Sequence, residues 1–200
     1  MRPTVLNGRT LRLEPLSMLH APGLAAIIDA DTFAHFPPPF RPEGDALHAA
    51  EMYIRARAAE GLAFAMVLQG GTDGSSGGRV VGASCYLDVR PQHRGLEIGA
   101  TFIARDQRGT RVNPEAKLLM LGHAFDTLGC VRVQLKCDAR NLASAAAIAK
   151  LGAVREGVLR RHMVMHDGFM RDTVMFSITD AEWPGVRQRL LARLGYPDAP

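Results

Sequence analysis

The sequence has few cysteines, few aromatic residues and no long apolar run. Only three of its 200 residues are cysteine, and 6% are aromatic. Three cysteines without a C-x-x-C spacing argue against a disulfide framework, and they predict buried free thiols in a reducing cytoplasm. The absence of 18 consecutive apolar residues excludes a membrane-spanning helix. The first four residues lack an apolar segment, so we expect no signal peptide.

Lysine is also scarce. Lys117, Lys136 and Lys150 stand beside 21 arginines, and the net charge is +4. Much of this bias is explained by the composition of a GC-rich genome or of a heat-adapted source. Alternatively, some arginines hold an anion through forked hydrogen bonds. A nucleic-acid binder is disfavoured because the charge is small and no basic stripe is interleaved with aromatics.

Apolar periodicity, caps and turn residues predict one α/β domain over residues 1–200, without repeats or linkers. We expect strands at 11–16, 62–69, 79–89, 96–103, 131–137, 158–165 and 169–178. We expect helices at 17–28, 43–60, 113–128, 141–151 and 181–194, with a proline-rich loop at 33–40 and a glycine-rich loop at 70–78.

The clearest unit is strand 96–103, helix 113–128 and strand 131–137. Asn113 is expected to cap this helix and Pro114 to open it, with Leu118, Leu121, Phe125 and Leu128 as its buried stripe. A right-handed crossover makes the two strands parallel neighbours. Ligands bind beyond the carboxyl ends of such strands, which directs attention to the loop 104–113.

That loop combines cations with a helix start. Arg105, Arg108 and Arg111 precede the helix, and Gly109 allows close approach of the backbone to a ligand. Free N–H groups and the helix dipole favour a phosphate there. The alternative is a solvated basic turn.

The loop resembles the pyrophosphate-binding loop of the GNAT acyltransferases, Arg/Gln-x-x-Gly-x-Gly/Ala. Arg108 matches its first position, whereas Arg111 replaces the first glycine and Asn113 the last small residue. Further segments resemble the ribosomal-protein-alanine N-acetyltransferase subgroup, and the similarity covers about residues 8–180. These segments are 113–117, 123–125, 141–144, 150–153, 156–161 and 171–174.

The resemblance implies a mixed, V-splayed sheet with helices on both faces, with its core at about 8–180 and a C-terminal helix at 181–194. It implies a bacterial, cytoplasmic enzyme that uses acetyl-CoA without a metal. The pantetheine arm would enter between strands 96–103 and 131–137, and an amine would attack directly. We expect no nucleic-acid or membrane partner, and a homodimer is compatible with the sequence.

The resemblance also assigns cofactor-binding residues. The pyrophosphate loop would comprise Arg108, Gly109, Thr110, Arg111, Val112 and Asn113, and a backbone N–H among Phe102, Ile103 and Ala104 would hold the thioester carbonyl. Asn141 would touch CoA besides capping its helix. Ser144 would protonate the departing CoA thiolate; alternatively, it is an ordinary first-turn serine.

The general base is less defined. Met163 occupies the position of the glutamate that the subgroup can use. Glu97 and His162 are the remaining candidates, although Glu97 could pair with arginine and His162 could lie on the surface. An α-amine has a pKa near about 8, against about 10.4 for lysine, so a weak base suits an N-terminal or small-molecule amine.

The acceptor pocket is expected from Phe33, His35, Phe36, Tyr53 and His162, although the aromatic residues could simply pack the first two helices. The sequence thus predicts an acetyl-CoA-dependent N-acetyltransferase that acts on a protein N-terminus or a small amine. The alternative is a non-catalytic acyl-CoA sensor on the same fold.

Overall fold

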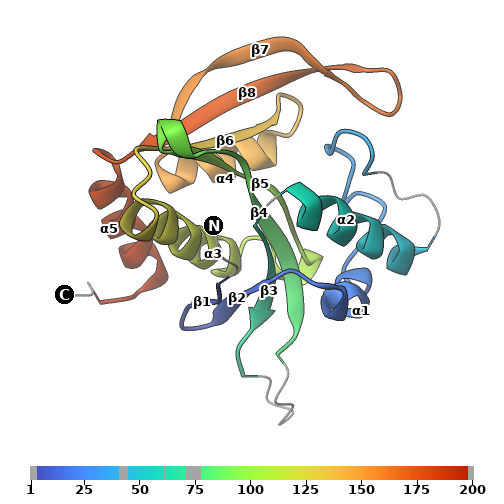
Figure 1. Ribbon diagram of the computed structural model, residues 1–200, viewed down its shortest axis with the longest axis horizontal. Coiled ribbons are helices and arrows are strands. Elements are labelled where there is room, and N and C mark those ends of the chain that lie inside the picture. Colours follow the sequence, from blue (N-terminus) through green and yellow to red (C-terminus); the bar gives the residue numbers. More distant parts are fainter. Residues whose placement is uncertain (1–3, 41–44, 61, 71–77, 198–200) are drawn as a thin grey trace.

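The computed structural model describes residues 4–40, 45–60, 62–70 and 78–197. Within these ranges the strands form one sheet in the order β1-β2-β3-β4-β5-β6-β8-β7 (Figure 1). The strands are β1 Leu6–Asn7, β2 Leu11–Pro15, β3 Ala63–Leu68, β4 Val80–Arg90, β5 Gly95–Ile103, β6 Arg132–Asp138, β7 Val154–Val164 and β8 Met170–Thr179. The helices are α1 Ala21–Ala25, α2 Ala46–Glu60, α3 Val112–Gly122, α4 Leu142–Leu151 and α5 Trp183–Leu194.

The predicted crossover between β5 and β6 is confirmed. These two strands are parallel, whereas every other neighbouring pair in the described sheet is antiparallel. The pairing is short, from Gly95 opposite Arg132 to Glu97 opposite Gln134. Beyond this point β5 runs on to Ile103 and β6 to Asp138 without pairing to each other within the described chain. The sheet is therefore splayed at its centre.

Helices cover both faces of the sheet, as expected. Figure 1 shows α1 and α2 on one side and α3, α4 and α5 on the other. Two separate clusters of buried apolar residues correspond to these two sides. Among the described residues, no helix is both long and apolar enough to cross a membrane.

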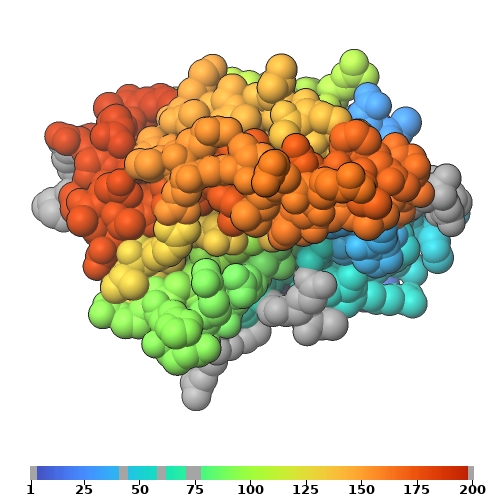
Figure 2. Space-filling view, turned by 90° about the horizontal axis from the view of Figure 1, so that it is seen from above, coloured from blue at the N-terminus to red at the C-terminus, as the bar shows by residue number. Residues whose placement is uncertain are grey.

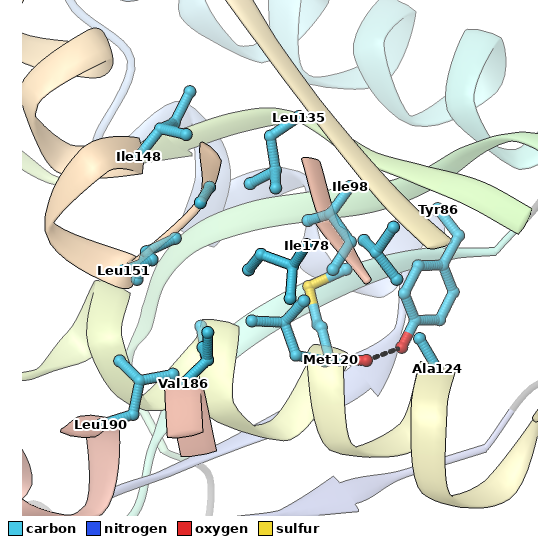
Figure 3. Packing of buried hydrophobic residues seen from close by; sticks show 14 of the residues in the cluster. Tyr86, Ile98, Met120, Ala124, Leu135, Ile148, Leu151, Ile178, Val186 and Leu190 are labelled. Carbon is cyan, nitrogen blue, oxygen red and sulfur yellow. Dashed lines mark hydrogen bonds between the residues drawn. The ribbon is translucent and has the colours of Figure 1, made fainter. Parts of the chain in front are cut away.

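Tyr86 links the sheet to α3 in the larger core cluster (Figure 3). Its hydroxyl donates to the carbonyl oxygen of Met120 at 2.6 Å. Around this bond Ile98, Leu135 and Ile178 bring apolar side chains from three strands together. A buried polar group needs such a partner, so this hydrogen bond lets the tyrosine lie inside the core.

Several predicted bounds were wrong. Asn113 does not cap α3, which begins at Val112 after Arg111 and continues as a π-helix over His123–Thr127. Pro114 in the first turn is compatible with this earlier start, because no intrahelical partner is needed for a proline nitrogen there. Leu118 and Leu128 are only half-buried.

The first helix and the late hairpin also differ from expectation. A short 3-10 turn, Met18–His20, leads into α1, which ends at Ala25 rather than at residue 28. Strand β7 begins at Val154, four residues before the predicted 158. Helix α5 begins at Trp183 rather than at 181. Most of the predicted glycine-rich loop, and the expected start of the helix at 43, lie outside the described residues.

Glu115 is fully buried and fixes the N-terminal turn to α3. Its carboxylate accepts hydrogen bonds from the backbone N–H groups of Arg9 and Thr10, the latter at 3.0 Å, and from the Thr10 hydroxyl. A carboxylate can accept all three, whereas an amide that replaces one oxygen with NH₂ cannot.

We therefore predict that Glu115→Gln lowers the free energy of unfolding by about 1–3 kcal/mol, because an amide has one accepting oxygen and its neutral hydrogen bonds are weaker than those of the charged carboxylate. Urea unfolding at neutral pH measures this difference. Glu51→Gln is the matched control, since Glu51 forms a surface pair with Arg55. It should change stability by less than about 0.5 kcal/mol. Equal effects of the two substitutions would contradict this role of Glu115.

Candidate functional site

The parting of β5 and β6 opens a cavity of about 690 Å³. Residues 97–103 of β5 and 135–138 of β6 form its walls together with side chains of α3, α4 and the loop 35–40, and α2, β4, β7 and β8 contribute further side chains. Eight predicted site residues line it: His35, Phe36, Glu97, Phe102, Ile103, Asn113, Asn141 and Ser144. The others do not: Phe33, Tyr53, Ala104, Arg108, Gly109, Thr110, Arg111, Val112 and His162.

The loop before α3 presents unused hydrogen-bonding groups. In the described contacts, the backbone N–H groups of Gly109 and Arg111 have no acceptor. Gly109 adopts φ +80°, a conformation that glycine reaches without strain. The Oδ1 atom of Asn113 is buried and unpartnered beside the cavity. The free N–H groups of Gly109 and Arg111, at a helix start, fit the phosphates of a nucleotide cofactor.

The arginine side chains of this loop point to different partners. Arg108 donates from Nε to the Ile103 carbonyl at 3.1 Å, and its Nη2 lies 3.6 Å from Asp29. Arg111 instead donates to the Leu194 carbonyl at 3.0 Å, at the end of α5. The side chain of Arg111 is thus engaged elsewhere, while its N–H remains free for a ligand.

Helix α4 begins as predicted. The Asn141 side chain accepts a hydrogen bond from the N–H of Ser144 at 2.9 Å, which confirms Asn141 as the N-cap. Both residues line the cavity. The cap holds the first turn of α4, and with it the Ser144 hydroxyl, against the opening between the strands.

Glu97 lines the cavity but is already paired. Its carboxylate lies 2.8 Å from the Lys136 ammonium and accepts from the Gln134 amide at 3.1 Å. The partner is therefore lysine rather than the arginine considered from sequence. Met163, which stands in place of the subgroup's glutamate, lines the same cavity and supplies no proton acceptor.

His162 lies on the exposed side of β7 and donates to or accepts from the Thr173 hydroxyl at 3.1 Å. Partial burial and the cations of Lys136 and Arg171 lower the pKa of His162, although Glu97 opposes this effect. The neutral form of the imidazole is therefore favoured. The ring lies near the cavity but does not line it.

The predicted aromatic pocket divides into two parts. Phe36 and His35 line the cavity. Phe33 and Tyr53 are buried in the smaller core cluster, where Tyr53 packs edge-on against Phe102 at 5.0 Å between ring centroids. The Tyr53 hydroxyl donates to the Ala100 carbonyl at 2.6 Å. Phe33 and Tyr53 therefore support the cavity wall by packing against Phe102, without lining the cavity themselves.

Sequence reasoning missed several ionisable residues of the cavity, among them Lys117, Asp138 and Arg171. Asp138 is buried at the end of β6 and pairs with Arg140 at 2.7 Å. Burial disfavours its charge, but the hydrogen bonds from Arg140 outweigh this and lower the pKa of Asp138 to about 2. One sequence signal was available, because Lys117 follows Asn113 by four residues and so shares its helix face.

Lys117 is a buried amine inside the site. It is 5% exposed, and its Nζ donates to the hydroxyls of Thr101 at 2.8 Å and Ser84 at 3.1 Å. No carboxylate in the described chain lies within ion-pair distance of it. Burial lowers the pKa of Lys117 to about 7, against a small opposing effect of Cys85.

This lowered pKa predicts a pH-dependent stability. The unfolded chain holds the Lys117 proton up to about pH 10.4, whereas the folded protein releases it near pH 7. The free energy of unfolding should rise with pH between these values, by at most about 1.4 kcal/mol per pH unit. Below pH 7 both states hold the proton, and the contribution becomes constant.

Urea unfolding from pH 6 to 10 of the wild type and of Lys117→Met isolates this effect. The wild type should gain stability relative to the variant as pH rises, because the methionine side chain does not titrate. Lys150→Met, on an exposed position of α4, should instead run parallel to the wild type. Parallel profiles for Lys117→Met as well would refute the lowered pKa.

Comparison with known proteins identifies the family to which this fold belongs. A model of the acetyltransferase (GNAT) domain matches residues 10–154. An acetyltransferase structure from T. thermophilus is 36% identical at a TM-score of 0.84, covering 97% of this chain and 98% of that one. A GCN5-related N-acetyltransferase from Brucella melitensis is 28% identical at a TM-score of 0.83, covering 96% and 86%.

A more distant structure has a bound CoA derivative. Mycobacterium smegmatis RimJ in complex with CoA-disulfide is 24% identical at a TM-score of 0.73, covering 96% of this chain and 92% of that one. No curated protein sequence matches the chain. The family model and the similar structures over nearly the whole length agree with the splayed sheet, and the chain therefore belongs to the GNAT family of N-acetyltransferases.

Proposed function

We propose that this enzyme transfers the acetyl group of acetyl-CoA to a protein N-terminal α-amine or a small-molecule amine, by direct attack in a ternary complex. The observation that carries the proposal is the cavity between the parted ends of β5 and β6, beside the start of α3. The family uses acetyl-CoA, and the RimJ neighbour holds a CoA derivative. We also propose that residues 1–200 form a single domain of the ribosomal-protein-alanine type.

The pyrophosphate would be held by the loop 108–113. The free N–H groups of Gly109 and Arg111 and the start of α3 supply donors, and Arg108 supplies charge. Thr110, Val112 and Asn113 complete the turn, and Asn141 borders the cavity from α4. Bound acetyl-CoA would supply an activated acetyl group as a thioester.

Ile103 is the best donor for the thioester carbonyl among the three residues considered. The Ala104 N–H is bonded to the Val81 carbonyl of β4 at 2.8 Å. Backbone groups alternate along a strand, so the N–H of Ile103 faces away from β4, toward the cavity. The Ile103 carbonyl agrees, since it accepts from Arg108 instead of from β4. A donor there would stabilise the developing oxyanion.

The cavity would offer a weak general acid and a weak general base for proton transfer. Ser144 would protonate the leaving thiolate, and Glu97, despite its pairing with Lys136, is the carboxylate that could receive the amine proton through water. An α-amine, with a pKa near about 8, is partly neutral at pH 7 and needs less help from a base than lysine does. This supports an α-amine or a small amine as the acceptor.

Binding of acetyl-CoA is the first test. Isothermal calorimetry should detect binding by the wild type, and Arg108→Glu should weaken it at least tenfold by placing a negative charge beside the phosphates. Arg160→Glu, on an exposed position of β7, is the matched control and should leave the affinity unchanged. The absence of both heat and a thermal shift with millimolar acetyl-CoA would overturn the proposed function.

Catalysis is tested separately at Ser144. We expect Ser144→Ala to lower the release of free CoA thiol with amine acceptors by about 100-fold, a typical contribution of a general acid. Its affinity for acetyl-CoA should remain close to that of the wild type. Binding without thiol release by the wild type, with any amine, would instead support the non-catalytic sensor.

A further inference from the structure

We propose that the acceptor carries a carboxylate next to its amine, and that Arg171 binds this carboxylate. The acceptor class is an α-amino acid with an apolar side chain. This inference rests on the proposed function and narrows its acceptor. It follows from a buried guanidinium in the cavity that no protein carboxylate pairs with.

Arg171 lies near the start of β8, lines the cavity and is 4% exposed. Its Nη1 donates to the His35 carbonyl at 3.0 Å. Its Nε is buried without a partner, and Nη2 makes no hydrogen bond within the described chain. The guanidinium is therefore held at one corner while the edge formed by Nε and Nη2 stays free.

The nearby carboxylates are already used. Glu97 pairs with Lys136 at 2.8 Å, and Asp138 pairs with Arg140 at 2.7 Å and lies 3.5 Å from the His35 ring. Asp88 pairs with Arg90 at 3.3 Å. None of the described ion pairs includes Arg171. An arginine cannot discharge itself by losing a proton, so its buried charge calls for an anion from outside.

The free edge selects the chemistry of that anion. Two parallel N–H donors in one plane match the two oxygens of a carboxylate. The Nη1 bond to His35 fixes the plane, so little side-chain entropy is lost when the second edge is occupied.

The position of Arg171 favours the acceptor over the cofactor. Its bond to His35 joins the β7–β8 hairpin to the loop 35–40, whereas the proposed phosphate site is made by residues 108–113. Figure 2 shows the hairpin, in orange, lying across this face of the molecule next to the blue N-terminal segments. His166 of the hairpin also contacts the Phe40 carbonyl at 2.9 Å.

Part of the wall around this end is apolar, although His35, Arg57 and Asp138 also line the cavity. Phe36, Phe40 and Met163 line the cavity together with three prolines at 37–39. Such a wall accommodates an apolar side chain. A free guanidinium edge for the carboxylate and an apolar surface for the side chain together describe an apolar amino acid.

The experiment compares amino acids with their amides. Leucine, methionine and phenylalanine are offered with acetyl-CoA, each beside its carboxamide, and the released CoA thiol is measured. We expect KM to be at least tenfold lower for the amino acid than for the amide. Supply of neutral amine cannot produce this preference, because the amide has the more acidic ammonium group and hence the larger neutral fraction.

Variants then assign the preference to Arg171. Arg171→Gln should raise KM for the amino acids at least tenfold while kcat/KM for the amides and the affinity for acetyl-CoA stay the same. Arg171→Lys should fall between the two, since lysine keeps the charge but loses the paired donors. Arg160→Gln is the control and should behave as the wild type.

The wild-type comparison does not depend on the folding of any variant. Equal or better use of the amides, or an unchanged preference in a folded Arg171→Gln, would overturn the inference and leave the proposed function standing. Failure of the wild type to bind acetyl-CoA or to release thiol with any amine would overturn both.

Discussion

The separation of β5 from β6 is the constraint on which the site depends. Three residue pairs hold these parallel strands together, and then the strands diverge. Beyond Glu97, the backbone groups that β5 directs away from β4 have no neighbouring strand, and such groups need other partners. Tyr53 meets the Ala100 carbonyl and Arg108 meets the Ile103 carbonyl. The rest of this β5 edge lines the cavity and is accessible to an extended ligand.

Lys117 and Arg171, two of the buried basic residues that line the resulting cavity, differ in how their charge can be balanced. Lys117 lies among hydroxyls, and its burial lowers its pKa to about 7, so it can become neutral by releasing a proton. Burial also lowers the pKa of Arg171, but a guanidinium keeps its proton in proteins. Asp138 and Glu97 favour this charge without pairing with it, so a bound anion would complete the balance. The same desolvation thus acts on a titrating amine in one wall and on a permanent cation in another.

Local signals in the sequence were sufficient for the framework. The strand–helix–strand unit between residues 95 and 138 depends on signals from residues close in the sequence, and so does the cap at Asn141. Both are present in the structure. The composition of the cavity could not be predicted in this way. Arg171 donates a hydrogen bond to a carbonyl 136 residues away in the sequence, and Arg111 donates to one 83 residues away. Such contacts depend on how the sheet and loops pack, which periodicity does not encode.

The weak base and the buried arginine are connected through the acceptor. Met163 supplies no proton acceptor, and Glu97 is paired with Lys136, so the amine has to reach its neutral form with little assistance. In a free amino acid the carboxylate stabilises the ammonium and raises its pKa. Pairing that carboxylate with Arg171 cancels this stabilisation, and the pKa of the amine falls toward that of a peptide α-amine. The guanidinium that would select the acceptor would then also make it easier to deprotonate.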